Sequence, residues 1–304
     1  MTLTIGELKR VLYENEVRPR RSLGQNFVVD PNTVRRIVRL AGIREGDLVV
    51  EVGAGLGSLT LALCEAGARV KAVEIDRRLI PQLRRALEGT SAEVIQADAL
   101  GVDWDELIGE DETSGGSAPF EAVDLEGSSR RECEDHGVVP SYRLVANLPY
   151  NIATSVVIDV LERARRIDSM LIMVQREVGE RMVARPRSKA YGSVSVKIAY
   201  WAEASLVGKV PSTVFYPRPN VESVLVKIER RGRKGEVPMS SRDDRYGRFC
   251  EVVEAGFGQR RKTLRSSLKG VVEPDSFDRV AISPGARAEE LSVDDWKRLC
   301  ELPR

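Results

Sequence analysis

Histidine is nearly absent from this 304-residue chain, and cysteine is sparse. The single histidine, His136, lies in a stretch rich in Gly, Ser and Glu, which nearly excludes catalytic triads and metal centres built on histidine. The four cysteines are too far apart for a metal knuckle, a CxxC redox pair or a disulfide framework. We therefore expect reduced thiols and no metal site.

Long hydrophobic runs are also missing. The longest candidate, residues 53 to 64, spans 12 residues and is rich in glycine, which is too short for a membrane helix. The first ten residues lack the basic start and the apolar run of a secretory signal. We expect a cytoplasmic protein that does not enter a membrane.

The net charge of +1 conceals a strong asymmetry. Residues 103 to 135 carry 12 acidic and two basic side chains. In contrast, residues 17 to 44 hold seven arginines and one aspartate, and residues 260 to 269 hold five Lys or Arg and no acid. One such cluster is often only a solvated helix face, but two on one chain favour a polyanionic partner.

Short apolar strands alternate with helices through the first two thirds of the chain, which predicts an α/β fold with a doubly wound parallel sheet. The expected strands are residues 47–53, 69–76, 92–100, 143–150 and 169–175. The expected helices are residues 4–16, a segment opening at Asp30 and Pro31, and residues 58–67, 78–87 and 154–164. Residues 194–204 and 221–230 have period-two or mixed character and would add antiparallel edge strands.

Two polar stretches interrupt this pattern. The composition of residues 109 to 141 predicts a flexible acidic insertion between the third and fourth strands. Residues 232 to 244 mark a domain boundary, after which only helical patterns follow, at residues 245–257, 260–270 and near 293–302. Since the length indicates two domains, we divide the chain into an α/β domain over residues 1–235 and a small helical domain over residues 236–304.

A glycine-rich turn follows the first strand of the sheet. Gly53, Gly55 and Gly57 would let backbone N–H groups approach a ligand at the start of the next helix. A dinucleotide fingerprint needs its third glycine at position 58, which is Ser58, so a pyrophosphate ligand is disfavoured.

Carboxylates stand at the ends of the next two strands. Glu74 follows Gly55 by 19 residues and could accept hydrogen bonds from both hydroxyls of a ribose. Asp98 could accept one from the exocyclic amine of an adenine. Because the carboxyl ends of successive parallel strands meet in one crevice, the glycines and these carboxylates predict an adenosine-containing cofactor.

The fourth strand ends in Asn147-Leu148-Pro149-Tyr150, which resembles the reaction motif of S-adenosylmethionine-dependent methyltransferases that modify exocyclic amines. An aromatic amine is a poor nucleophile because its lone pair is delocalised. The Asn147 oxygen and a neighbouring main-chain carbonyl can accept its two N–H bonds and direct the lone pair at a sulfonium methyl. Pro149 would fix that carbonyl, and Tyr150 would stack on a flipped base. The alternative is a simple strand-ending turn.

Seven segments, in one order, resemble the ribosomal RNA adenine N6,N6-dimethyltransferases, among them the bacterial kasugamycin-susceptibility methylases of the small ribosomal subunit. They are GQNFVVD (24–30), VGAGLGSLT (52–60), EID (74–76), QADAL (96–100), NLPYNIATS (147–155), VFYPRPNVESV (214–224) and FGQRRKTLRSSL (257–268). The resemblance implies a Rossmann-like methyltransferase sheet and S-adenosylmethionine as cofactor. It further implies a monomer that dimethylates two adjacent adenosines in the 3′-terminal helix loop of small-subunit rRNA during ribosome biogenesis.

The resemblance also assigns roles to single residues. It places Asn26 and Val28 at the methionine end of the cofactor, Gly53 and Gly55 at its back wall, Glu74 on the ribose, and Asp98 on the adenine. Asn147, Pro149 and Tyr150 would hold the target amine and its base, and Asn147 would also contact the cofactor. Phe215 would stack on the other face of the base. Contacts to RNA phosphates are expected from Arg18, Arg20, Arg21, Arg260, Arg261, Lys262 and Arg265.

Three other functions share parts of this pattern. An antibiotic-resistance methylase of large-subunit rRNA has the same fold, cofactor and reaction motif. A non-catalytic ribosome-assembly or RNA-binding factor would keep the fold without turnover, and a small-molecule methyltransferase would not need the basic clusters. The QRRKTLR segment (259–265), the helical tail and the intact motifs favour the small-subunit enzyme.

Overall fold

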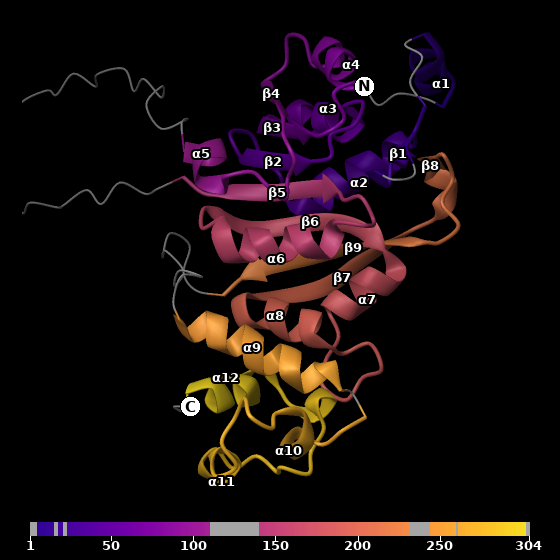
Figure 1. The fold of residues 1–304 in the computed structure, drawn as a ribbon. Coiled ribbons are helices and arrows are strands. Elements are labelled where there is room, and N and C mark those ends of the chain that lie inside the picture. The colour runs from indigo at the N-terminus through magenta and orange to yellow at the C-terminus, as the bar shows by residue number, and fades with distance from the viewer. Residues whose placement is uncertain are drawn as a thin grey trace, which may run out of the picture.

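A computed structural model describes residues 5–14, 18–20, 23–109, 140–231, 244–259 and 261–301. Its centre is a seven-stranded mixed sheet in the order β4-β3-β2-β5-β6-β9-β7, with helices on both faces (Figure 1). The strands are β2 (Leu48–Val52), β3 (Arg69–Glu74), β4 (Ala92–Gln96), β5 (Tyr142–Asn147), β6 (Ile167–Gln175), β7 (Ala202–Val210) and β9 (Ser223–Arg230). The five strands from β4 to β6 are parallel, whereas β9 pairs antiparallel with both β6 and β7.

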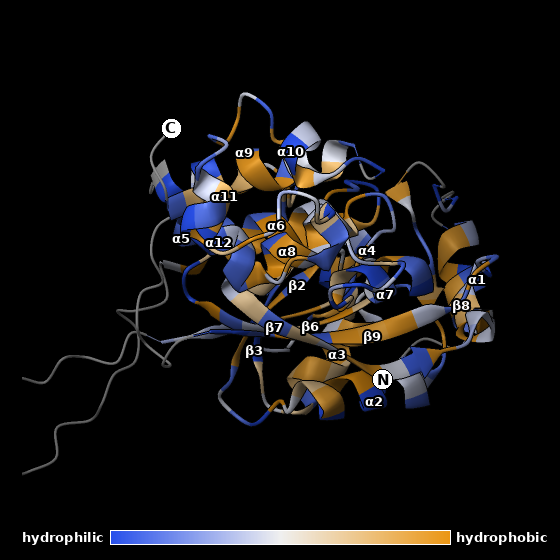
Figure 2. Cartoon of the chain, turned by 90° about the horizontal axis from the view of Figure 1, so that it is seen from below, coloured by the Kyte–Doolittle hydropathy of each residue, from blue (hydrophilic) through white to orange (hydrophobic). Residues whose placement is uncertain are grey.

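Helices cover both faces because the parallel strands carry apolar side chains on each side. The helices of the α/β region are α2 (Pro31–Ala41), α3 (Ser58–Glu65), α4 (Ile80–Ala86), α5 (Trp104–Gly109), α6 (Ala153–Arg163), α7 (Arg176–Met182) and α8 (Ser193–Trp201). Buried side chains of α2 and α3 pack on one face of the sheet, and those of α5, α6 and α8 pack on the other. Figure 2 shows the hydrophobic residues concentrated on the strands and on the central helices.

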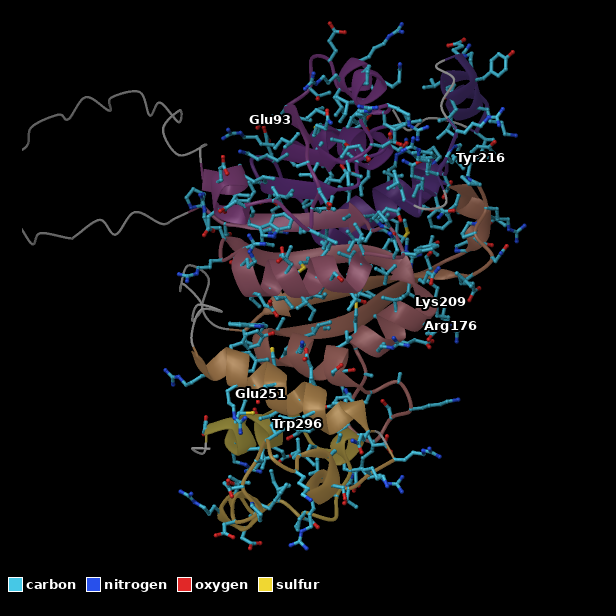
Figure 3. All side chains as sticks on the ribbon, viewed as in Figure 1. Glu93, Arg176, Lys209, Tyr216, Glu251 and Trp296 are labelled. Atoms are coloured by element: carbon cyan, nitrogen blue, oxygen red, sulfur yellow. The ribbon has the colours of Figure 1, made fainter. Side chains whose placement is uncertain are left out.

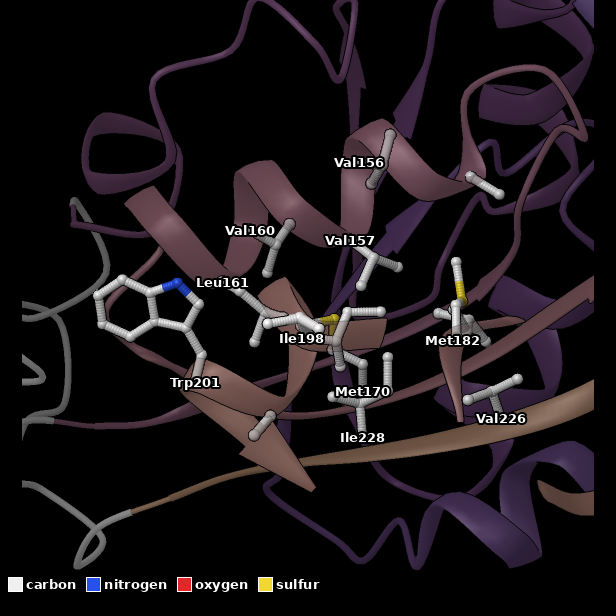
Figure 4. Close-up of a cluster of buried hydrophobic side chains, with 14 of the residues drawn as sticks. Val156, Val157, Val160, Leu161, Met170, Met182, Ile198, Trp201, Val226 and Ile228 are labelled. Carbon is white, nitrogen blue, oxygen red and sulfur yellow. The ribbon is translucent and has the colours of Figure 1, made fainter. Parts of the chain in front are cut away.

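The larger core lies between α6, α8 and the sheet. Figure 4 shows Val157 and Leu161 of α6 meeting Ile198 of α8 over Met170 and Ile228 of the strands, and all five side chains are at most 2% exposed. This packing ties the antiparallel strands at one side of the sheet to the parallel strands that end at the candidate site.

The C-terminal residues form helices that continue the same core. They are α9 (Asp244–Gly258), α10 (Leu264–Ser267), α11 (Ser276–Arg279), a 3₁₀ turn (Ala288–Glu290) and α12 (Val293–Glu301). Phe249 of α9 packs against Tyr200 of α8 with ring centroids 4.5 Å apart. Trp296 is fully buried, and a Cβ on Gly256 would lie 2.4 Å from its ring, so only glycine fits there. The boundary predicted at residue 235 falls outside the described residues, and the division into two domains stays a prediction.

The parallel strands and the helices between them are confirmed, but the expectation of two antiparallel edge strands was wrong in two respects. Residues 193–201 form α8, and the extended segment β7 begins only at Ala202. The alternation of Val194, Val196 and Ile198 is too short to distinguish a strand from a buried helix. In the folded chain this segment packs against α6 and α9, which stabilises the helix. The second expected segment, β9, is an antiparallel strand, but it lies inside the sheet.

Other elements differ in extent from the prediction. The strand predicted to reach residue 100 ends at Gln96, and the helix predicted over residues 260–270 is reduced to the single turn of α10. Of the acidic insertion predicted at residues 109–141, residues 110–139 lie outside the described residues. No helix in the described ranges has the length and apolar character needed to cross a bilayer.

A small two-stranded sheet stands beside the main one. It pairs β1 (Phe27–Val28) with β8 (Phe215–Tyr216) in antiparallel register, so that Val28 faces Phe215. The N-terminal helix α1 (Ile5–Glu14) covers this pair, because Leu8 and Leu12 pack on Phe27. The segment before α2 is thereby held next to the carboxyl ends of β2 and β5.

Candidate functional site

A cavity of about 280 Å³ opens at the carboxyl ends of β2, β3, β4 and β5. In the strand order, β3 and β4 lie on one side of β2 and β5 lies on the other, which makes this the switch point where open α/β sheets bind ligands. Every residue predicted to hold the cofactor lines the cavity, namely Asn26, Val28, Gly53, Gly55, Glu74, Asp98 and Asn147. Sequence segments more than 120 residues apart are thus brought together in one site.

The glycine-rich turn forms the floor of the cavity. Gly53 and Gly55 have φ angles of 76° and 61°, in the left-handed region that favours glycine. A Cβ on Gly55 would lie 3.1 Å from the ring of Phe27. Glycine is therefore needed both for the backbone conformation and for the close approach of the loop before α2.

Glu74 is held by the backbone around the cavity. One carboxylate oxygen accepts a hydrogen bond of 2.8 Å from the Gly55 N–H, and the other accepts one of 2.8 Å from the Asp76 N–H. The side chain is 5% exposed, and its burial raises its pKa. Each oxygen retains a second lone pair, so the carboxylate can still accept from the paired hydroxyls of a ribose.

Glu51 also lines the cavity, and the sequence reasoning assigned it no role. Its carboxyl group is 2% exposed and accepts a 2.6 Å hydrogen bond from the Thr60 hydroxyl. Burial raises the pKa of Glu51 to about 8, and the charge of Glu74 adds to the effect. The described lining includes no Lys or Arg. A cationic ligand in the cavity would favour the ionised form of these buried carboxyl groups.

A second network, also missed, closes the cavity on the side of residues 23–28. The Gln25 side-chain amide donates a 3.0 Å hydrogen bond to Asp76, which also pairs with Arg78 at 2.6 Å. The hydrogen bonds from Arg78 lower the pKa of Asp76 to about 2 despite the partial burial of the carboxylate. The segment of residues 74–76 therefore has two roles: it supplies Glu74 to the cavity, and through Asp76 it holds the loop of residues 23–28 in place.

Asn147 stands at the end of β5 with its orientation fixed. Its Nδ2 donates a 2.9 Å hydrogen bond to the main-chain oxygen of Asn26, which leaves Oδ1 as the atom that accepts. Pro149 lines the cavity next to it and lies close to Gly53. The sequence predicted that Asn147 would present one acceptor to an exocyclic amine and that Pro149 would fix the neighbouring main-chain carbonyl that presents the other. Asp98, which is exposed, has Oδ1 bound by the Leu100 N–H, so Oδ2 remains for an adenine amine.

The two predicted stacking residues do not line the cavity. Tyr150 is half-buried, and its hydroxyl lies 3.3 Å from the Ser223 hydroxyl. Phe215 is 3% exposed and packs in the core with Val28 and Val34. In this conformation the ring of Phe215 has no face open to a base, and its stacking role stays a prediction.

The basic residues that the sequence singled out fall in two places. Arg18 and Arg20 are exposed in the segment that leads to the cavity, whereas Arg261, Lys262 and Arg265 are exposed after α9. Arg21 and Arg260 lie outside the described residues. Within the described ranges, no cluster of His, Cys, Asp or Glu is suited to a metal ion.

Comparisons with known proteins agree with this geometry. A family model described as ribosomal RNA adenine dimethylase matches residues 17–303. A curated protein of Bifidobacterium longum subsp. infantis named ribosomal RNA small subunit methyltransferase A is 39% identical, over 98% of this chain and 92% of its own length. The protein of the same name from Kineococcus radiotolerans is 42% identical, over 93% of this chain and 85% of its own length.

Two solved structures share the fold. A dimethyladenosine transferase from Plasmodium falciparum has a TM-score of 0.65 at 21% identity, covering 89% of this chain and 94% of its own. The 23S rRNA methyltransferase ErmE has a TM-score of 0.59 at 26% identity, covering 90% of this chain and 98% of its own. The family model and the curated relatives span both the cavity and the C-terminal helices. This chain belongs to the ribosomal RNA adenine dimethylase family.

Proposed function

We propose that the chain is an S-adenosylmethionine-dependent enzyme that dimethylates the N6 amines of two adjacent adenosines of small-subunit rRNA. The observation that carries the proposal is the meeting of Asn147 with Glu74 and the glycine-rich turn in one cavity. The curated relatives at about 40% identity, named for the small subunit, support the substrate. The likeness to a large-subunit methyltransferase is weaker, at 26% identity.

The residues of the cavity fit the cofactor. Glu74 offers two fixed acceptors to a ribose, Asp98 offers one to an adenine amine, and Gly53 and Gly55 leave room against the backbone. Glu51 and Glu74 place two buried carboxyl groups beside a molecule that carries a sulfonium and an ammonium group. When bound, S-adenosylmethionine supplies an electrophilic methyl group.

Asn147 and the following main chain would orient the target amine. The fixed Oδ1 accepts one N–H bond, and the carbonyl that precedes Pro149 can accept the second. Each acceptor pulls the nitrogen towards tetrahedral geometry and aims its lone pair into the cavity. The chemistry rests on positioning and electrostatics, so it needs no strong base. A monomethylated amine still donates one hydrogen bond, which allows a second transfer.

The exposed cations would bind the RNA through its phosphates. Arg18 and Arg20 lie in the segment that leads to the cavity, Arg261 and Lys262 lie in the turn between α9 and α10, and Arg265 lies on α10. We propose that the chain acts as a monomer on the small ribosomal subunit or its precursor in the cytoplasm.

Transfer of labelled methyl groups to isolated ribosomal subunits tests the proposal. Small subunits that lack the modification should become labelled, and large subunits should not. Label only in large subunits would favour the resistance-methylase alternative. Tight binding of small subunits without label would favour a non-catalytic assembly factor.

A further inference from the structure

The loop between α7 and α8 lies at the same end of the strands as the cofactor cavity, the end where the parallel strands have their carboxyl termini. Arg176, the first residue of α7, directly follows the carboxyl end of β6. Figure 1 shows the loop on the side where β5 and α9 also end, and Figure 3 shows Arg176 on the same side as Tyr216 of β8. Residues 183–192 therefore stand between the mouth of the cavity and the C-terminal helices.

This loop presents arginines that no carboxylate neutralises. Arg185 and Arg187 are exposed, and neither forms an ion pair with another described residue. The arginines of the adjacent helix differ, since Arg176 pairs with Glu180 at 2.7 Å and Arg181 pairs with Glu177 at 2.9 Å. Glu177 and Glu180 are thus paired within α7, and residues 183–192 contain three basic side chains and no acid.

Arg187 adopts a backbone conformation that disfavours its side chain. Its φ angle is 68°, in the left-handed region, where a glycine or an asparagine would be less strained. The conformation is held by a 2.7 Å hydrogen bond from the Arg187 N–H to the main-chain oxygen of Glu289. Strained backbone conformations cluster at functional sites, which singles out the exposed side chain of Arg187 as a contact to test.

The loop is fastened to the segment that holds the C-terminal basic residues. The buried Tyr191 donates a 2.8 Å hydrogen bond to the Leu291 main-chain oxygen. A few residues earlier, the Pro284 oxygen accepts a 3.0 Å hydrogen bond from the Arg265 N–H. Residues 284–291 therefore fix the loop and the Arg265 turn to each other.

We propose that Arg185 and Arg187 bind phosphates of the substrate RNA and bridge the cavity to the cluster of Arg261, Lys262 and Arg265. The surface would hold the helical RNA on which the target loop stands, since paired RNA is recognised through its backbone and shape. The inference rests on the proposed RNA substrate, and it adds a contact site that the basic segments in the sequence did not indicate.

The test is the affinity for small ribosomal subunits lacking the modification, measured by filter binding over a range of KCl concentrations. The double variant Arg185→Gln with Arg187→Gly should bind roughly tenfold more weakly at physiological salt, because two charge-assisted contacts are lost. The slope of log affinity against log salt should fall by about one to two. The melting temperature should stay equal or rise, because glycine relieves the strain at position 187.

Arg165→Gln is the matched control. Arg165 is exposed and lies between α6 and the amino end of β6, at the opposite edge of the sheet. It should leave both affinity and slope unchanged. Wild-type affinity and slope in the double variant would overturn the inference, even if methyl transfer proceeds. Conversely, weaker binding by the double variant supports the inference even if the wild type transfers no methyl group and the proposed function fails.

Discussion

The side chain of Asn147 donates a 2.9 Å hydrogen bond to the main-chain oxygen of Asn26. One residue ends β5 and the other belongs to the loop that closes the cofactor cavity, so the proposed reaction motif and the cofactor wall are directly joined. The same bond determines which atom of the Asn147 amide faces outward as an acceptor. Orientation of the amine and closure of the cavity therefore depend on one contact.

Replacement of Asn147 separates turnover from cofactor binding. Asn147→Ala should lower the methylation rate by about 100-fold or more, as for the loss of a positioned polar group in other active sites. The dissociation constant for S-adenosylmethionine, measured by calorimetry, should change only several-fold. Asn32→Ala, at an exposed position of α2 outside the cavity lining, is the matched control and should keep turnover. Equal losses of turnover and cofactor binding in Asn147→Ala would make Asn147 mainly a cofactor ligand.

Glu74 should determine cofactor affinity. In Glu74→Gln, an NH₂ group replaces one of the two oxygens that accept from backbone N–H groups, and one of the two acceptors offered to the ribose is lost. We expect the dissociation constant for S-adenosylmethionine to rise by roughly 10- to 100-fold, the equivalent of one to two charge-assisted hydrogen bonds. Glu203→Gln, at an exposed position of β7, should leave the constant unchanged. An unaltered affinity in Glu74→Gln would place the ribose elsewhere.

Glycine at position 55 serves two purposes that a paired substitution can separate. Gly55 and Gly46 both have positive φ angles, but only a Cβ on Gly55 would meet Phe27, at 3.1 Å. Alanine at either position should lower the free energy of unfolding by about 1 to 2 kcal/mol because of the left-handed backbone. Only Gly55→Ala should also weaken cofactor binding. Similar cofactor binding in both variants would exclude close approach as the reason for this glycine.

Burial of Glu51 makes stability depend on pH. Its pKa is raised from 4.5 to about 8 in the folded chain, so the native state holds a proton that the unfolded state has released. The contribution is therefore fully present below pH 4.5 and is lost as the pH rises towards about 8, by at most about 1.4 kcal/mol per pH unit.

Urea unfolding at several pH values measures this dependence. Glu51→Gln keeps a side chain that can accept from Thr60 but cannot ionise, so the free energy of unfolding should vary less with pH than in the wild type. Some dependence should persist, because burial also raises the pKa of Glu74. Identical pH profiles for wild type and variant would show that Glu51 is not the titrating group.

Much of the cofactor wall could be predicted from the sequence, because buried parallel strands are recognisable by their composition and their carboxyl ends are the usual place for a ligand. Their apolar runs locate β2 to β5, and the rule that ligands bind at carboxyl ends then brings Gly55, Glu74 and Asn147 together. Features that depend on packing could not be predicted. Val196 and Ile198 alternate as in a strand but lie on a buried helix, and the pairing of Val28 with Phe215 joins two-residue strands without a local pattern.

The same limit applies to single residues. Glu51 directly precedes the segment VGAGLGSLT (52–60), yet only its burial and the 2.6 Å bond from Thr60 show that it belongs to the site. Arg187 lay outside both basic segments, and only its φ angle and its bond to Glu289 mark it as unusual. Burial and backbone conformation are properties of the folded chain, so composition and spacing do not reveal them.

Nucleoside mapping of the product tests the central claim most directly. Small subunits lacking the modification are incubated with S-adenosylmethionine and wild-type enzyme or Asn147→Ala, and the 3′-terminal rRNA fragment is sequenced by mass spectrometry. Wild type should convert two adjacent adenosines of the terminal helix loop to N6,N6-dimethyladenosine, whereas Asn147→Ala should leave them largely unmodified. Methyl groups on another base or another atom, or equal modification by the variant, would contradict the account.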